Sequence, residues 1–207
     1  KEPGKGFVYS DCWVDDARLV VLNGLDAARH GADIRPHSRV ERAQRTGDHW
    51  MLTLADGTTA EARALVNAAG PWVAQMLRQT GVESRSSVRL VKGSHIIVPR
   101  LFEGDHAYML QQPDGRIVFA IAYQHGLTLV CTTDESVDAP EDAKITPTEI
   151  DYLCTAVNRY FTRQTAPADI VSTYSGVRPL YDDGEAEAKA VTRDYVLELD
   201  ERKPPLL

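Results

Sequence analysis

The 207-residue chain has an ordinary globular composition, with 43% hydrophobic and 26% charged residues. This length suits one large domain or two small ones. The net charge of -7 at pH 7 argues against a nucleic-acid surface, because such surfaces are strongly basic. No apolar run approaches the roughly 20 residues of a membrane-spanning helix.

Cysteines and histidines suggest neither disulfides nor a metal site. The three cysteines form no C-x-x-C pair, and their odd number is typical of reduced thiols in a compartment facing the cytosol. We interpret Cys12, Cys131 and Cys154 as small buried hydrophobic residues. The six histidines show no H-x-x-H or H-E-x-x-H pairing, so no metal is expected.

The first part of the chain predicts a helix followed by strands. Asp15 or Asp16 can cap the helix, its apolar residues recur near the helical period, and Gly31 ends it. A strand is expected at 32–34, as the first of three or four between residues 32 and 70.

Later signals in this part mark a hairpin and a short helix. Asp56-Gly57 predicts the hairpin turn. The last strand ends in an apolar run, as a buried parallel strand would. Residues 70–81 then form a short helix, with Pro71 in its first turn and Gly81 as its stop.

From residue 88 onward the pattern changes to antiparallel strands. "VRLVKGSHIIVPR", "AYMLQQPDGRIVFAIAY" and "LTLVCTTDES" are strand-like, with a turn at Pro113-Asp114-Gly115. "TPTEIDYLCTAVNRYF" predicts a helix, in which Thr146 and Glu149 form a capping box. Its buried stripe is expected to hold these residues: Ile150, Leu153, Ala156 (or Val157) and Tyr160. The acidic segment "DDGEAEAKA" is interpreted as a mobile surface loop.

These elements predict a mixed α+β fold with two parts. Residues 1–87 form an α/β part, and residues 88–207 form a mostly antiparallel sheet with one long helix. The chain has no initiator methionine and ends on a Leu-Leu pair without a closing element. We therefore interpret it as a piece of a longer protein.

The segment "LVNAAGPWV" is an apolar strand that runs into small residues and then a helix. Asn67, Ala68, Ala69 and Gly70 leave room for a ligand to meet the backbone, and the helix N-terminus offers free N–H groups to an anion. A tight strand–helix junction without a ligand explains the pattern equally well.

The segment "VRLVKGSHIIVP" places Lys92, Ser94 and His95 around Gly93 in an otherwise apolar strand. A glycine within a strand often marks a bulge or a close approach of the backbone. The polar cluster then needs a partner. An edge strand with a solvated face is the alternative.

The segment "TYSGVRPLYDD" places Arg178 between a Gly-Val step and a proline. We interpret it as a stiff turn, in which Gly176 lets the backbone bend and Pro179 fixes it. Arg178 would then present a planar guanidinium to a carboxylate or phosphate. The alternative is a solvated loop arginine.

Five segments together resemble, in order and spacing, the middle of the FAD-dependent, quinone-linked glycerol-3-phosphate dehydrogenases. They are "GFVYSDCWVDDARLV", "LVNAAGPWV", "RLVKGSHIIVPR", "VCTTDES" and "STYSGVRPL…VTRDY". The resemblance covers nearly the whole chain. The chain departs from the family by lacking its G-x-G-x-x-G strand–turn–helix and by having Cys131 where the family usually has glycine.

The resemblance implies a flavoprotein in two parts. A partial FAD-binding α/β domain over 1–87 would place Arg39 and Val40 near the adenine. It would place four more residues near the flavin edge: Ala68, Ala69, Gly70 and Trp72. An antiparallel-sheet lobe over 88–207 would cover the flavin and hold the substrate.

The resemblance also implies that Arg178 and Arg193 bind the phosphate of sn-glycerol 3-phosphate, since two arginines suit a dianion. Oxidation at C2 would give dihydroxyacetone phosphate, with electrons passing through FAD to a quinone. His95 belongs to the pKa class that could accept the hydroxyl proton. A structural histidine is the alternative.

Three other functions stay open at this point. A glycerophosphate oxidase would pass the electrons to oxygen. A flavin amine or amino-acid oxidase would need one arginine for a carboxylate rather than a pair for phosphate, so Arg193 is the residue that discriminates between the two. A non-catalytic binding module is favoured for the piece itself by the missing nucleotide motif. We expect a cytoplasmic location, or a peripheral position on the inner face of the cytoplasmic membrane.

Overall fold

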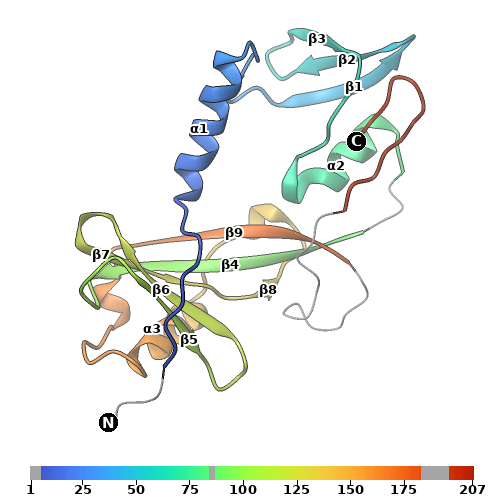
Figure 1. Cartoon of the computed structure of the whole chain (residues 1–207). Coiled ribbons are helices and arrows are strands. Elements are labelled where there is room, and N and C mark those ends of the chain that lie inside the picture. Colours follow the sequence, from blue (N-terminus) through green and yellow to red (C-terminus); the bar gives the residue numbers. More distant parts are fainter. Residues whose placement is uncertain (1–5, 84–86, 183–195) are drawn as a thin grey trace.

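The computed structural model describes residues 6–83, 87–182 and 196–207. Its elements form two groups (Figure 1). The first, blue to green in the figure, holds helix α1, a three-stranded sheet and helix α2. The second holds a six-stranded antiparallel sheet, with helix α3 packed on it. This arrangement confirms the predicted mixed fold class.

Helix α1 (Asp16–Arg29) begins and ends where the sequence predicts. The Asp15 side chain accepts a hydrogen bond from the Arg18 N–H at 3.1 Å, and Gly31 follows the helix with φ +93°. No residue of α1 is buried against the described chain, although it carries apolar side chains along its length. The strand predicted at 32–34 is wrong, since these residues form no ladder with a described neighbour.

The first sheet is antiparallel, in the order β1-β2-β3. Its strands are β1 (Val40–Thr46), β2 (His49–Leu54) and β3 (Thr59–Ala62). Asp56-Gly57 forms the predicted hairpin turn: Gly57 has φ +82° and donates its N–H to the Leu54 carbonyl. The predicted buried parallel strand is reduced to one parallel bridge, between Leu65 and Leu206.

The last described residues pack on this first sheet. Trp50 is fully buried and its Nε1 donates to the Pro205 carbonyl at 2.9 Å. Arg45 and Asp200 form an ion pair at 2.8 Å, and Leu206 joins the core that contains Trp50. The division near residue 87 stays a prediction, while residues 200–207 contact the first group.

The small-residue turn after Leu65 leads into η1 (Gly70–Trp72) and α2 (Val73–Thr80), as predicted. Pro71 lies in the first turn, and Gly81 ends α2 with φ +66°. Element η1 contacts β9 of the second sheet. This turn therefore lies where the two groups meet.

The second sheet has the order β5-β6-β7-β4-β8. Its strands are β4 (Val88–Pro99), β5 (Ala107–Gln111), β6 (Ile117–Tyr123), β7 (Leu127–Cys131), β8 (Glu135–Ser136) and β9 (Ser172–Tyr181). Strands β7 and β8 pair with successive stretches of one edge of β4, and β9 pairs with its opposite edge. The turn predicted at residues 113–115 joins β5 to β6. Because β4 has partners on both sides, the edge-strand alternative for it is wrong.

Arg178 lies within β9, opposite Val91 of β4, so the predicted turn is wrong. Gly176 and Pro179 are strand residues as well. In the described chain β9 pairs with β4 alone, and such an edge strand tolerates proline because an outward N–H needs no ladder partner.

Helix α3 (Pro147–Asn158) covers one face of the second sheet. The predicted capping box of Thr146 and Glu149 is present. Leu153 and Ala156 are buried as predicted, and the core they join includes Ile96 of β4. The predicted stripe is wrong at Tyr160, which is exposed because the helix ends before it. Ile150 is half-buried.

Three further short elements are helical turns: η2 (Gln124–Gly126), η3 (Pro140–Asp142) and η4 (Pro167–Asp169). Cys131 and Cys154 are buried free thiols as predicted, whereas Cys12 is exposed. Within the described residues, no helix has the length and apolarity needed to cross a membrane. Most of the acidic segment predicted to be a mobile loop lies outside those residues.

Candidate active site

The candidate residues of β4 and β9 divide between the two faces of the second sheet. Directly paired residues share a face, and successive residues of a strand alternate. His95 pairs with Tyr174 and Cys131, and Gly93 pairs with Gly176. These residues and Arg178 share one face, which we call the open face; its members are Gly93, His95, Cys131, Tyr174, Gly176 and Arg178.

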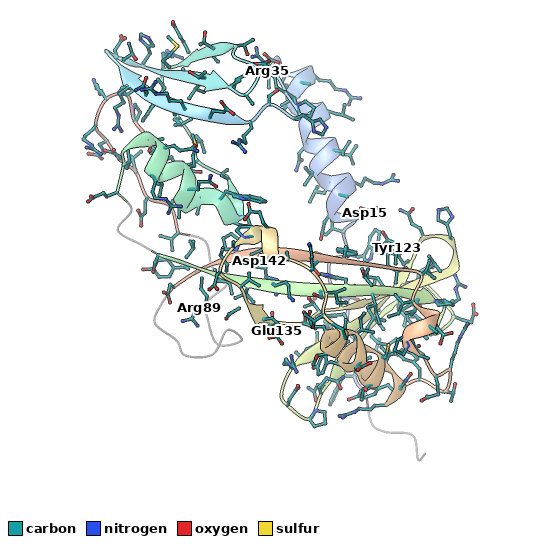
Figure 2. The ribbon with its side chains drawn as sticks, turned by 180° about the vertical axis from the view of Figure 1, so that it is seen from behind. Asp15, Arg35, Arg89, Tyr123, Glu135 and Asp142 are labelled. Atoms are coloured by element: carbon teal, nitrogen blue, oxygen red, sulfur yellow. The ribbon has the colours of Figure 1, made fainter. Side chains whose placement is uncertain are left out.

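Helix α3 packs on the opposite face of this sheet. The start of α1, labelled Asp15 in Figure 2, lies on the side of the sheet away from α3, and Figure 1 agrees from the other direction. The open face therefore looks toward the first group of elements.

The Arg178 side chain is held by the loop after β7. Its Nη1 donates to Asp134 Oδ1 at 2.6 Å, and its Nη2 donates to Thr132 Oγ1 at 3.4 Å. A Cβ at Gly93 would lie 2.5 Å from Thr132 Oγ1 and 2.9 Å from Arg178 Nη2, so glycine is required for this arrangement. We call Gly93, Thr132 and Asp134 the arginine seat.

The seat pairs the charge of Arg178 with Asp134 but does not use all of its N–H donors. The side chain is 31% exposed, so it is not the fully solvated arginine of the alternative interpretation. A guanidinium has five N–H donors, and the contacts to Asp134 and Thr132 use two of them. A planar, permanently charged donor held at a fixed place suits a carboxylate or phosphate ligand.

His95 stacks on Tyr174, with ring centroids 4.3 Å apart and an interplanar angle of 7°. Its Nδ1 is buried and has no hydrogen-bond partner in the described structure. Burial, and next the positive charge of Arg178, lower the pKa of His95 below its ordinary value. The imidazole is therefore neutral near pH 7 and able to accept a proton.

Two other titratable groups on the open face are poor bases at neutral pH. Burial raises the pKa of the Cys131 thiol to about 11. Burial also raises the pKa of the Tyr174 hydroxyl to about 12. Both groups stay protonated, which leaves His95 as the proton acceptor among these three.

The structure separates Lys92 and Ser94 from His95, although the three are close in sequence. Both point to the α3 side, where they bind the Glu149 carboxylate: Lys92 Nζ donates to Oε2 at 2.8 Å and Ser94 Oγ to Oε1 at 2.8 Å. Lys92 and Glu149 are almost fully buried, with side chains 6% and 4% exposed. Glu149 is therefore the partner of Lys92 and Ser94, two of the three residues in the predicted polar cluster.

The Glu149 carboxylate is charged over a wide pH range. Burial alone would raise its pKa, but hydrogen bonds from Lys92, Thr133, the Thr146 backbone and Ser94 outweigh burial and lower the pKa to about 2. This site is a compensated buried ion pair.

The residues expected near the cofactor lie apart in the first group. Arg39 is largely exposed before β1, and Val40 packs beside the first core. No hydrogen bond in the described chain joins them to the turn that holds Ala68, Ala69 and Gly70. Trp72 is 45% exposed, and its Nε1 donates to Glu141 Oε1 at 2.8 Å. Their proposed cofactor roles stay predictions, and Arg193 lies outside the described residues.

A cleft of about 620 Å³ lies between α2 and the second sheet. Its walls include Trp72, Arg78, Arg89 and Glu141, and Figure 2 labels Arg89 at one end of the sheet. The cleft therefore includes Trp72, one of the residues expected near the flavin edge, but none of the open-face residues.

Sequence reasoning assigned no role to Thr132 and Asp134, and it did not connect Glu149 with Lys92. The polar "TTD" at the end of the strand-like segment "LTLVCTTDES" was the available signal for the loop, although the whole segment was predicted as strand. For Glu149, the capping box explained the residue on local grounds alone. Its contacts with β4 depend on how α3 packs, which no local pattern reveals.

Residues 2–199 match the DAO family, described as FAD dependent oxidoreductase. A glycerol-3-phosphate dehydrogenase of Pseudomonas tolaasii is 51% identical over 201 residues, covering 94% of this chain and 39% of that protein. A D-erythritol 1-phosphate dehydrogenase of Brucella abortus is 47% identical over 204 residues, covering 95% of this chain and 41% of that protein.

The crystal structure of a glycerol-3-phosphate dehydrogenase from Bacillus halodurans, complexed with FAD, has a similar fold. The TM-score is 0.72 at 29% sequence identity, over 83% of this chain and 36% of that one. This chain thus spans about two fifths of the length of these relatives. The family match extends over nearly all of its residues, and the chain belongs to the FAD dependent oxidoreductase family.

Proposed function

We propose that the full-length protein oxidises the C2 hydroxyl of sn-glycerol 3-phosphate to give dihydroxyacetone phosphate. The observation that carries the proposal is that two residues share the open face. They are Arg178, held by the arginine seat, and His95, whose pKa is lowered. Two relatives of 51% and 47% identity are named as dehydrogenases of alcohol phosphates, which supports the same substrate class.

Residues of the open face fit a flat cofactor. Gly176 presents no side chain there, and a Cβ at Gly176 would meet nothing within 4 Å, whereas the space over Gly93 is filled by Arg178 and Thr132. FAD, when bound, supplies the acceptor for the hydride that leaves C2.

The chain's own residues would supply binding and proton transfer. Arg178 binds the phosphate and so places C2, while His95 accepts the proton of the C2 hydroxyl. Arg193 is proposed as the second phosphate ligand. Ala68, Ala69, Gly70 and Trp72 are proposed near the flavin edge, with Arg39 and Val40 near the adenine.

D-erythritol 1-phosphate is a second candidate substrate, because one of the two relatives above is named for it. It shares a phosphate with sn-glycerol 3-phosphate but has a longer carbon chain. Arg178 would recognise the phosphate of either compound. Discrimination would therefore depend on residues near the far end of the substrate.

A quinone is the proposed electron acceptor, and the proposed location is the cytoplasm or the inner face of the cytoplasmic membrane. The electron acceptor distinguishes this dehydrogenase from a glycerophosphate oxidase. Comparing the reoxidation of reduced enzyme by a soluble quinone and by oxygen tests the choice.

Anaerobic reduction of the enzyme's flavin tests the substrate class. Full-length, flavin-loaded protein is mixed with sn-glycerol 3-phosphate, D-erythritol 1-phosphate or a D-amino acid, and loss of the oxidised flavin spectrum is followed. We expect fast bleaching with an alcohol phosphate. Bleaching by the amino acid alone would contradict the proposal.

The Arg178→Lys variant tests the residue that carries the proposal. Lysine keeps the charge but not the flat two-pronged donor, and a displacement of about 1 Å can cost on the order of 100-fold in rate. We expect kcat/KM to fall by about that factor with normal FAD content. Arg116→Lys is the matched control, since Arg116 is 27% exposed, pairs with Asp114 at 2.8 Å and lies outside the open face. Equal kinetics in the two variants would remove Arg178 from the site.

A further inference from the structure

The Glu149 carboxylate lies behind the arginine seat, on the α3 side of the second sheet, and accepts five hydrogen bonds. Oε1 accepts from Ser94 Oγ at 2.8 Å and Thr133 Oγ1 at 2.7 Å. Oε2 accepts from Lys92 Nζ at 2.8 Å, and from the Thr146 N–H and hydroxyl at 2.8 and 3.0 Å. Glu149 is 3% exposed, so water does not compete for these bonds.

The residues bound by Glu149 are chain neighbours of the arginine seat. Lys92 and Ser94 flank Gly93 in β4. Thr133 lies between Thr132 and Asp134, and its Oγ1 also accepts a hydrogen bond from the Ser94 N–H at 2.9 Å. One carboxylate thus ties the strand beneath the Arg178 guanidinium to the loop that holds it.

The same group reaches the strand that carries Arg178. Ser94 Oγ lies 2.9 Å from Ser175 Oγ of β9, three residues before Arg178. All three segments that meet at the guanidinium are therefore connected, through the sheet, to the first turn of α3.

A purely structural role would not require this arrangement. A capping box needs only the bonds between Glu149 and Thr146. Apolar residues of similar volume often hold a helix on a sheet as well as a buried ion pair does, because removing charges from water is costly. In some proteins, buried ionic groups fix one particular geometry.

We propose that Glu149 is a positioning residue for Arg178, holding the arginine seat from the far face of the sheet. It contacts neither substrate nor cofactor. The inference deepens the proposed function, because the seated guanidinium is the group to which the substrate phosphate would bind. Its effect should appear mainly in KM, since the phosphate takes no part in the bond changes at C2.

Two isosteric substitutions separate positioning from stability. Thr133→Val removes the hydroxyl that joins Glu149 to the seat loop, and Thr146→Val removes the hydroxyl that joins Glu149 to its own helix. In the full-length flavoprotein both should lower Tm. Only Thr133→Val should raise the KM for sn-glycerol 3-phosphate, by about tenfold, a change of about 1.4 kcal/mol. Thr133→Ser should restore KM, because it keeps the hydroxyl.

A measurement without turnover completes the test. Crystal structures of the full-length Thr133→Val and Thr146→Val proteins give the distance from Arg178 Nη1 to Asp134 Oδ1. We expect the guanidinium to be displaced in the first variant and to keep its 2.6 Å contact in the second.

The two proposals fail in different ways. If unsubstituted flavoprotein is not reduced by an alcohol phosphate, the proposed function is wrong, and the crystallographic distances still decide the role of Glu149. If the enzyme is active but the two variants share one KM, or Arg178 stays seated in Thr133→Val, the positioning role of Glu149 is overturned.

Discussion

At the scale of single residues, the position of Arg178 depends on a missing side chain as much as on its partners. The guanidinium lies over Gly93, and Asp134 and Thr132 fix its edge. A glycine within a strand usually weakens the strand. Here it provides the space in which a charged group can lie flat against the sheet.

Gly93→Ala should therefore displace Arg178. The new Cβ would fall 2.5 Å from Thr132 Oγ1, a distance that forces the loop to move. Overpacking of this kind costs about 1–3 kcal/mol. Urea denaturation of the 207-residue chain should show that loss for Gly93→Ala, and binding of inorganic phosphate to the full-length protein should weaken.

Gly176→Ala is the matched control for stability. Gly176 pairs with Gly93 on the same face, but a Cβ there would meet nothing within 4 Å. Its free energy of unfolding in urea should change by no more than an ordinary surface substitution causes, about 0.5 kcal/mol. If both variants lose similar stability, then any side chain added on this face is destabilising. The arginine seat would then not explain the glycine at position 93.

The two residues that motifs predicted at this scale, Arg178 and His95, share the open face, while their proposed roles stay predictions. Their partners were beyond a sequence pattern. Asp134 is 44 residues from Arg178 along the chain, and the two meet only because β7 and β9 lie on either side of β4. The spacing of residues along the sequence does not predict such neighbours.

At the scale of elements, local signals predicted helices better than strands. The capping box begins α3 and a left-handed glycine ends α2, because these features depend on bonds within a few residues. The strand predicted at 32–34 was wrong, and Arg178 lies in a strand where a turn was predicted. A strand depends on hydrogen bonds to a neighbouring strand, which a local pattern does not reveal. Gly176 and Pro179 are typical turn residues, but in the structure both pair with β4.

The stability that Glu149 contributes by joining α3 to β4 should depend on pH. Its pKa is about 2 in the folded chain against an ordinary value of 4.5, so its charged form favours folding by about 3 kcal/mol. This stability is complete above about pH 4.5 and is lost as the pH falls toward 2.

Urea unfolding at several pH values checks this expectation. Glu149→Gln should be less stable than the unsubstituted chain at pH 7, because Lys92 then keeps a buried charge without its partner. The difference should shrink as the pH falls below about 4.5. Asp151→Asn, on an exposed position of the same helix, controls for the loss of a carboxylate. A difference that is constant with pH would mean that Glu149 acts by shape alone.

At the scale of the whole molecule, the first group of elements is less complete as a packed unit than the second. The second sheet buries a continuous core under α3. Helix α1 buries none of its residues against the described chain, and Val20 and Val21 are 70% and 60% exposed. The sequence predicted α1 correctly as a helix, because the apolar period is local, but burial of its apolar side chains needs a partner surface.

The isolated 207-residue chain should bind little FAD. It contains no G-x-G-x-x-G turn, whose helix N-terminus would hold the pyrophosphate, and the contacts proposed for the open face are with the flavin ring. Purified under identical conditions, the isolated chain should be colourless and the full-length protein yellow. Added FAD should remain separable from the isolated chain by gel filtration. Stoichiometric flavin on the isolated chain would show that the ring contacts, and not the pyrophosphate site, provide most of the affinity.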